Sequence, residues 1–236
     1  MLDLEEKEAI RIIRMNHAGE NKFTKPFIEA LNQALDQVEA DASAKAVVLT
    51  GAAEKFFSTG MDLNWIMTLS KDAWIPFFLE MDKLLHRVFV FPKPMVAAVN
   101  GHAFAGGLFL ALCTDYRVMR EDRGYMCMPE IDLGIHLPPG TVELISHVMG
   151  ARNSEFMALS GKRLTPKEAH DLGAVDELAK AELVLPRSVE IARLIAAKNP
   201  KTYAQHKQQL RKNAALVMEL EDPPFIREFM SQRPGG

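Results

Sequence analysis

The fold is indicated by two stretches of similar design, residues 46–63 (AVVLTGAAEKFFSTGMDL) and residues 95–113 (MVAAVNGHAFAGGLFLALC). Each begins with a short apolar run that is typical of a buried strand. Each then passes through a loop that contains glycine into a segment with helical features. Asp62 is placed to cap one helix, and an apolar helix is expected over residues 106–113. A strand, a glycine loop and a helix, occurring twice in this order, predict an α/β core.

Outward from these stretches, strands and helices alternate early in the chain and helices dominate late. Residues 10–15 (IRIIRM) alternate apolar and basic side chains, which predicts a half-exposed strand. Further short strands are expected at 116–119 and 124–128. Helices are expected at residues 23–40, 73–89, 140–149, 153–160, 166–172, 185–197, 201–220 and 225–231. The pattern predicts an α/β core followed by a helical C-terminal part.

The composition is that of an ordinary globular protein. The chain has 236 residues, of which 48% are hydrophobic and 25% charged, so it can bury a core without disulfides. The formal net charge of −3 offers no basic field for nucleic acid. The acidic N-terminus does not resemble a secretory signal, and no apolar run reaches the ~20 residues of a membrane span. Cys113 and Cys127 are expected to be buried free thiols, so we expect a cytoplasmic protein without nucleic-acid or membrane partners.

The two glycine loops could form a binding site for a developing negative charge. Residues 56–63 and 100–107 each lead from a strand into a helix, and the first N–H groups of a helix have no partner within it. If the loops face each other, two such N–H groups can donate to one oxyanion. The glycines fit two simple tight turns equally well, so the pattern alone leaves both interpretations open.

Glu130 is the residue best suited to acid–base chemistry. It lies within residues 126–135 (MCMPEIDLGI), a largely apolar segment, and burial there would raise its pKa and make it a base near neutral pH. The alternative is a solvent-facing glutamate at the end of a strand. His102, in the second glycine loop, and His136, six residues after Glu130, are not assigned a catalytic role by their pattern. No cluster has the spacing of metal ligands, so no metal site is expected.

In combination these segments resemble the enoyl-CoA hydratase/isomerase (crotonase) family. The resemblance rests on FFSTGMDL, NGHAFAGGLFLALCTDYRV and MPEIDLGI, with RMNHAGEN before them and SGKRLTPKEAHDLGAVDEL after them. It implies an α/β fold, a crotonase-like spiral of ββα units, over residues 1–180. It also implies a helical C-terminal region at residues 181–236 that covers the active site and completes a homotrimer or a dimer of trimers. The implied substrate is an acyl-CoA thioester. Coenzyme A is part of that substrate, and no separate cofactor is expected.

The resemblance also assigns roles to individual residues. The oxyanion donors match the backbone N–H groups of Met61 and Gly106, and the base matches Glu130. Lys55 matches a contact to a phosphate of coenzyme A. The segments that resemble the stretch holding the adenine end contain Asn21, Lys22, Phe23, Asp62 and Leu63. Further substrate contacts are expected from Gly60, Gly107, Phe109 and His136.

One departure from the family pattern favours isomerisation over hydration. Hydratases of the family carry a glutamate in the helix after the second glycine loop, where this chain has Phe109. A single carboxylate beside an apolar ring favours moving one proton and excluding water, as in the delta-3, delta-2-enoyl-CoA isomerases, which residues 115–135 also resemble. Pro138 stands where dienoyl-CoA isomerases have an aspartate. Asp132, the candidate nucleophile of dehalogenase-type members, should point away from Glu130 if the segment is a strand.

The sequence therefore predicts an isomerase that converts 3-enoyl-CoA to 2-enoyl-CoA through an enolate. Hydration or thioester hydrolysis on the same scaffold is the first alternative, in which His136 or His102 would have to handle water. A non-catalytic acyl-CoA-binding or oligomerisation module is the second.

Overall fold

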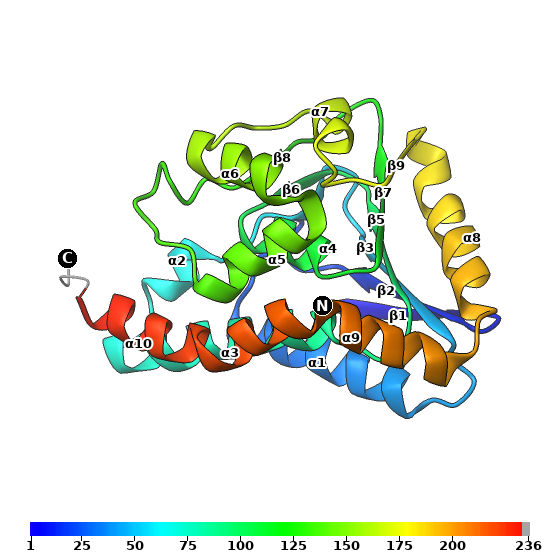
Figure 1. Cartoon of the computed structure of the whole chain (residues 1–236), viewed down its shortest axis with the longest axis horizontal. Coiled ribbons are helices and arrows are strands. Elements are labelled where there is room, and N and C mark those ends of the chain that lie inside the picture. The colour runs from blue at the N-terminus through cyan, green and yellow to red at the C-terminus, as the bar shows by residue number, and fades with distance from the viewer. Residues whose placement is uncertain (233–236) are drawn as a thin grey trace.

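The computed structural model describes residues 1–232, and over these residues the strands form a six-stranded sheet and a three-stranded sheet (Figure 1). The order in the large sheet is β1-β2-β3-β5-β7-β9, with β1 antiparallel to β2 and the other neighbours parallel. Its strands are β1 (Leu2–Lys7), β2 (Ile10–Met15), β3 (Ala46–Gly51), β5 (Met95–Val99), β7 (Tyr116–Arg120) and β9 (Glu177–Ala179). The small, parallel sheet consists of β4 (Phe56–Ser58), β6 (His102–Phe104) and β8 (Met126–Cys127).

The helices follow the strands in a repeating order. The chain passes from the large sheet to the small sheet and then into one or two helices, as β3-β4-α2-α3, β5-β6-α4 and β7-β8-α5. The helices before residue 180 are α1 (Lys25–Ala40), α2 (Leu63–Ile66), α3 (Lys71–Phe89), α4 (Gly106–Leu112), α5 (Pro139–Met149), α6 (Ala151–Ser160) and α7 (Pro166–Asp171). Those after it are the 3-10 helix η1 (Ala181–Leu183), α8 (Val184–Ala196), α9 (Pro200–Leu220) and α10 (Asp222–Gln232). The predicted α/β fold with a helical C-terminal region is confirmed.

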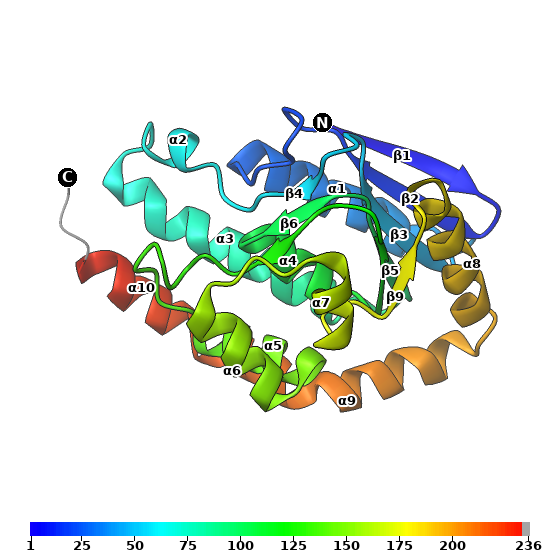
Figure 2. The same ribbon diagram turned by 90° about the horizontal axis from the view of Figure 1, so that it is seen from above.

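The inner strands of the large sheet, β2, β3, β5 and β7, are buried on both faces, and alternate residues of each point to the two faces. On one face Ile12, Val48 and Val96 pack under α8, which lies along one side of the sheet in Figures 1 and 2. On the other face, side chains such as Leu49 and Ala97 belong to the main core with α1, α3 and α4. A sheet covered on both sides needs nearly continuous apolar strands, as the sequence of β3 and β5 shows.

The strand expected at residues 10–15 is confirmed, but the expectation that it is half exposed is wrong. β2 lies between β1 and β3, and five of its six residues are buried. The basic side chain that suggested exposure, Arg11, is buried and donates to Asp41, beyond the end of α1. The edge strands β1 and β9 were not predicted, and the strand expected at 124–128 is confined to Met126–Cys127.

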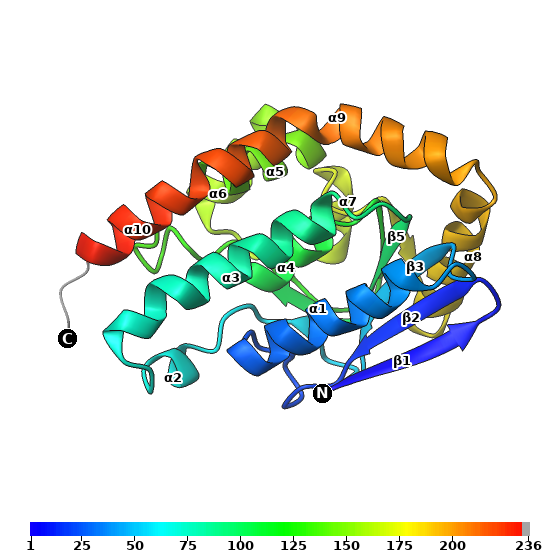
Figure 3. The ribbon, with the colours of Figure 1, turned by 90° about the horizontal axis from the view of Figure 1, so that it is seen from below.

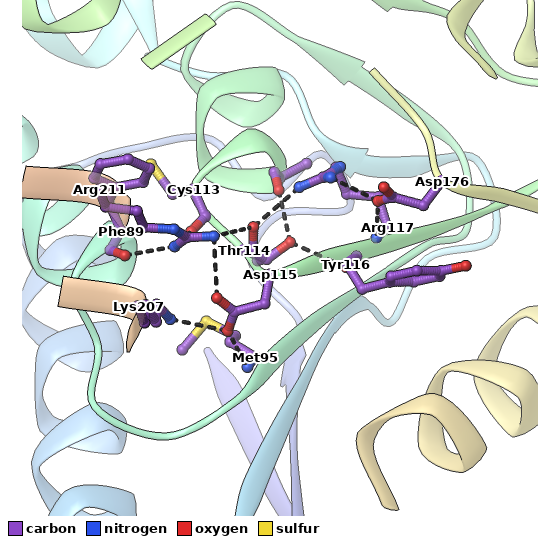
Figure 4. A network of polar contacts seen from close by, with 11 residues as sticks. Phe89, Met95, Cys113, Thr114, Asp115, Tyr116, Arg117, Asp176, Lys207 and Arg211 are labelled. Carbon is purple, nitrogen blue, oxygen red and sulfur yellow. Dashed lines mark hydrogen bonds and ion pairs between the residues drawn. The ribbon is translucent and has the colours of Figure 1, made fainter. Parts of the chain in front are cut away.

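Helix α9 is fixed to the core by a buried charge network around Asp115 (Figure 4). The carboxylate of Asp115 forms ion pairs with Lys207 Nζ at 2.8 Å and Arg211 Nη2 at 3.0 Å, and it accepts a hydrogen bond from the backbone N–H of Met95 at 2.7 Å. Arg211 also donates to the carbonyl oxygen of Cys113 at 3.0 Å. Helices α9 and α10 then run along one side of the molecule, past α5 and α3 (Figure 3). Among residues 1–232, no helix combines the length and apolar character that crossing a membrane requires.

Candidate active site

A cavity of about 70 Å³ lies just beyond the C-terminal ends of β4 and β6, between them and helices α3, α5 and α10. Five residues that the sequence singled out line it: Met61, Gly106, Phe109, Glu130 and His136. They come from segments as much as 75 residues apart in sequence, which the fold brings together around one cavity. A neighbouring hollow of about 300 Å³ shares part of this wall, including Met61.

The two glycine loops are in direct contact, which the sequence could not establish. A Cβ atom on Gly60, whose φ is +77°, would stand 2.7 Å from the backbone nitrogen of Gly106. A Cβ on Gly107 would overlap the carbonyl oxygen of Ser58. Glycine at these positions therefore lets β4 approach the start of α4 closely.

The backbone N–H groups of Met61 and Gly106 have no acceptor within the described chain. Phe23 pairs with Met61 in a parallel bridge, in which Phe23 N–H donates to Gly60 O at 2.7 Å and Asp62 N–H donates to Phe23 O at 3.1 Å. In such a bridge the N–H of Met61 points away from Phe23. Gly106 is the first residue of α4, where helical N–H groups have no internal partner. Two donors of the kind an oxyanion hole needs thus belong to residues of one cavity wall.

Backbone strain is located at the same junction. Ala105, the residue before α4, has a φ of +49° and a ψ of −126°. This conformation favours glycine, and a residue with a Cβ adopts it only where its surroundings hold it in place. The N–H of Ala105 donates to Cys127 O at 3.0 Å, which ties the loop to β8.

Glu130 is a buried carboxyl group without a hydrogen-bond donor on one oxygen. Its residue is 8% exposed, and its Oε2 atom is buried and has no partner within residues 1–232. Burial raises the pKa of Glu130 to about 7. It lies in a turn over residues 129–134, not at the end of a strand as the sequence alternative supposed, and its carbonyl oxygen accepts from Ile135 N–H at 2.9 Å. The turn removes the basis of the two-residue alternation assumed for Asp132, which is exposed and is not part of the cavity wall.

Much of the remaining cavity wall is aromatic and aliphatic. Phe109, three residues after Gly106 on α4, is 6% exposed and borders the cavity. The His136 ring lies 4.9 Å from that of Phe229 on α10, centroid to centroid. His102 instead lies outside the cavity, where its Nδ1 accepts from Tyr125 N–H at 3.1 Å.

The remaining sequence-predicted residues surround the loops and do not line the cavity. The side chain of Asn21 is occupied by backbone groups, donating to Phe57 O and accepting from His17 N–H. Lys22 pairs with Glu20 at 3.0 Å. The ammonium group of Lys55 lies 5.1 Å from the centroid of the neighbouring Phe56 ring.

The residues on either side of the α2 start behave differently. Asp62 caps α2 as expected, accepting from Trp65 N–H at 3.1 Å. Leu63 is half exposed and lines the neighbouring hollow.

Sequence reasoning expected the C-terminal helices to cover the site, but it named no residue of α10 and missed the contribution of α3. Asp82, in the middle of α3, lines the cavity together with Phe78 and Leu85. These three residues follow the spacing i, i+4 and i+7, so an acid within an apolar helical stripe was the signal that could have been noticed. In the described part of the chain, no group of three or more His, Cys, Asp or Glu residues could hold a metal ion.

Comparison with known proteins points to a single family. The profile described as "Enoyl-CoA hydratase/isomerase" matches residues 5–222. The chain is 33% identical to an Arabidopsis thaliana protein named enoyl-CoA delta isomerase 2, peroxisomal, over 95% of this chain and 98% of that one. It is 32% identical to a probable enoyl-CoA hydratase of Bacillus subtilis (strain 168), over 94% and 88% of the two chains. The crystal structure of human mitochondrial delta3-delta2-enoyl-CoA isomerase matches with a TM-score of 0.91 and 25% identity, covering 98% of this chain and 90% of that one.

The relatives thus include proteins named for both reactions, and the two kinds match at almost the same identity. The family match extends over both sheets and the helices as far as the start of α10, and so includes every residue of the two glycine loops and Glu130. With this coverage and a fold shared with solved members, the chain belongs to the enoyl-CoA hydratase/isomerase family.

Proposed function

We propose that the protein is a delta-3, delta-2-enoyl-CoA isomerase, which moves the double bond of a 3-enoyl-CoA to position 2. The observation that supports this most directly is the state of Glu130: buried, lacking a donor on Oε2, with its pKa raised to about 7 by burial. A carboxyl group with a pKa near the working pH is suited both to accept a proton and to return it. It shares a cavity with the unpaired N–H groups of Met61 and Gly106.

The proposed mechanism moves one proton and no other group. The thioester oxygen accepts hydrogen bonds from the N–H groups of Met61 and Gly106. As Glu130 removes a proton from the α carbon, the C–H electron pair forms a double bond between the thioester carbon and the α carbon, and the carbonyl π pair becomes the negative charge of a dienolate on that oxygen. When the thioester carbonyl reforms, the α–β double bond is made, the electrons of the old β–γ double bond take the proton from Glu130 at the γ carbon, and the shift is complete. The product is a 2-enoyl-CoA, and Glu130 is again ionised.

Exclusion of water is the contribution of Phe109 and the apolar residues of α10. A hydratase must hold a water molecule against the β carbon, which needs polar groups at that position. Here the ring of Phe109 borders the cavity from α4. One observation favours the alternative of hydration, since Asp82 is a second carboxyl group in the same wall. A water molecule held between Asp82 and Glu130 would make the protein a hydratase.

Replacing Glu130 tests the mechanism. Glu130→Gln preserves shape and removes the base, so turnover of 3-hexenoyl-CoA should fall by roughly 10²–10⁴-fold. Glu143→Gln, at an exposed position on α5, is the matched control and should turn over at the wild-type rate. If the Glu130→Gln variant isomerises as fast as wild type, the mechanism is wrong.

A second substrate separates the alternatives. Wild-type protein incubated with crotonyl-CoA should form no 3-hydroxyacyl-CoA, and its appearance at a rate above that of isomerisation would identify a hydratase. Release of free coenzyme A from either thioester would identify a hydrolase. Binding of acyl-CoA without any product would identify a non-catalytic binding module.

We also propose how coenzyme A lies on the surface. Its adenine end would contact the backbone around Asn21, Lys22 and Phe23, next to Asp62 and Leu63, where the Phe23–Met61 bridge joins the two segments. Lys55 would meet a phosphate, for which its side chain would leave the Phe56 ring. The buried free thiols Cys113 and Cys127 suit a reducing compartment such as the cytoplasm, which we propose as its location.

The assembly that we propose is a homotrimer, alone or as a dimer of trimers. Large apolar side chains remain exposed on the C-terminal helices, among them Leu194 on α8 and Leu210 and Leu220 on α9. Apolar side chains that are exposed on the single chain would become buried where subunits meet. Sedimentation at micromolar concentration should give three or six times the chain mass of 26.4 kDa, and a monomer would contradict the proposal.

A further inference from the structure

Two buried carboxyl groups meet beside the cavity. Asp82 lies on α3 and is 6% exposed, and Asp222, the first residue of α10, is fully buried. Asp222 Oδ1 accepts from Gly140 N–H at the start of α5, at 2.6 Å. Its Oδ2 atom is buried and has no donor among residues 1–232. The carboxyl group of Asp82 is close enough to act on Asp222 both through its charge and through a shared hydrogen.

The two acids lie on the helix faces that build the cavity. On α3, Phe78, Asp82 and Leu85 line it. On α10, the cavity residues are Phe225, Ile226, Phe229 and Met230, which stand 3, 4, 7 and 8 positions after Asp222. Asp222 therefore begins the same helical face that carries the apolar wall. Whatever fixes Asp222 against α3 also fixes that wall over the cavity.

A carboxylate cannot donate a hydrogen bond, so two carboxyl groups can bond to each other only while they share a proton. We propose that Asp82 and Asp222 are positioning residues, and that the proton shared between them holds α10 closed over the substrate cavity. The role in substrate handling rests on the proposed function. The closure of α10 does not.

None of the titratable groups near Asp82 and Asp222 replaces the shared proton between the two carboxyl groups. Burial and the neighbouring Asp222 raise the pKa of Asp82 to about 8, and Lys83 on α3 opposes this weakly. Burial likewise raises the pKa of Asp222, with Glu221 acting in the same direction. From the α4 side, Cys113 is the titratable group that faces Asp82, and Glu130 and His136 lie elsewhere in the cavity wall.

The sign of the pH effect follows from proton counting. When α10 opens, both carboxyl groups reach water. Each then has the ordinary aspartate pKa of about 4 and is ionised above that pH. The closed form keeps one proton up to about pH 8. Between pH 6 and about 8, the opening constant should therefore rise roughly tenfold per pH unit, and it should level off above that range.

Amide hydrogen exchange of residues 222–232 in the full chain measures this opening. The observed exchange rate of each amide is divided by its intrinsic rate at the same pH to give the opening constant. Wild type should show the rise between pH 6 and 8. In Asp82→Asn, the carboxamide donates an N–H to the Asp222 carboxylate without any shared proton. This variant should show no such rise and should be better protected than wild type at pH 9. Because Lys207 also titrates near pH 8, the share of the rise due to the pair is the part that Asp82→Asn abolishes.

Asp82→Leu completes the series, because it leaves Asp222 Oδ2 buried without a donor. The amides of α10 in this variant should be poorly protected from exchange at every pH. Its KM for 3-hexenoyl-CoA at pH 8.5 should exceed that of Asp82→Asn by roughly tenfold at similar kcat, because one buried hydrogen bond is lost. If Asp82 only filled space, the asparagine of Asp82→Asn would not restore the protection of α10 independently of pH. If wild type and Asp82→Asn show the same pH trend, or if Asp82→Asn exchanges as fast as Asp82→Leu, the proposal is wrong. The comparison of wild type with Asp82→Asn is sufficient if Asp82→Leu does not fold, and it remains valid if no isomerase activity is found.

Discussion

At the scale of single residues, Glu130 shows how a reactive group conflicts with stability. Burial raises its pKa from the ordinary 4.5 to about 7, so the folded protein holds a proton that the unfolded chain has already released. A raised pKa of this kind means that the contribution of Glu130 to stability is full below pH 4.5 and is lost as the pH rises through 7. At pH 8 the group is an ionised carboxylate in an apolar wall.

Glu130→Gln should therefore stabilise the fold at alkaline pH while abolishing activity. A neutral amide has no charge to bury, so the gain in unfolding free energy at pH 8 should be up to ~3 kcal/mol, or several degrees in Tm. The gain should vanish near pH 4.5, where the glutamate is protonated in the folded state. Thermal unfolding of both proteins at the two pH values checks this. An equal difference at both values would show that packing, and not charge, separates them.

The sequence alone singled out those residues of the cavity wall that belong to short local motifs. Glu130 stands out as an acid in an apolar segment, and the loops at Met61 and Gly106 stand out by their glycines. The nearness of Asp82 to Asp222 was missed because the two residues lie 140 positions apart and are brought together only when α10 packs along α3. A pairing of this kind leaves no spacing signal in the chain.

At the scale of elements, the contact between β4 and α4 determines where the two N–H donors lie. Gly107→Ala would place a Cβ against the Ser58 carbonyl group, a rigid backbone group, and should force the two elements apart. We expect a loss of ~2–3 kcal/mol in stability together with a large loss of turnover. Gly106→Ala is the matched control, since its Cβ would meet the Phe23 ring edge at 3.1 Å, where a side chain can yield. Unfolding curves that rank Gly106→Ala as the more damaging change would contradict this view of the junction.

The sequence predicted the strands of the large sheet that are buried in the core, but it did not predict the strands at the two edges of that sheet. The apolar runs of β3 and β5 are buried on both sides, so their pattern is unambiguous. β1 is exposed along most of its length and carries acidic residues, so only its pairing with β2 makes it a strand. The residues around Glu130 form a turn because backbone contacts such as Ile135 N–H to Glu130 O outweigh local strand preference.

At the scale of the whole molecule, the C-terminal helices are joined to the core through buried charge. Asp115 lies between Lys207 and Arg211, and all three side chains are at least nine-tenths buried. Removing one partner of such a group leaves the others uncompensated in a region that water hardly reaches. The network therefore controls the attachment of α9 and, through it, the position of α10 over the cavity (Figures 3 and 4).

Asp115→Asn isolates the charge in this network, because an asparagine can still accept from the Met95 N–H while it no longer neutralises the two cations. The expected loss is ~3–5 kcal/mol of unfolding free energy, with a lower Tm and weaker exchange protection in α9 and α10. Asp171→Asn provides the control, since its ion pair with Lys167 on α7 is exposed, and water already screens it. If both substitutions shift the unfolding temperature equally, the buried network does not hold the C-terminal helices in place. A selective loss in Asp115→Asn would show that the wall of the cavity depends on a charge cluster outside it.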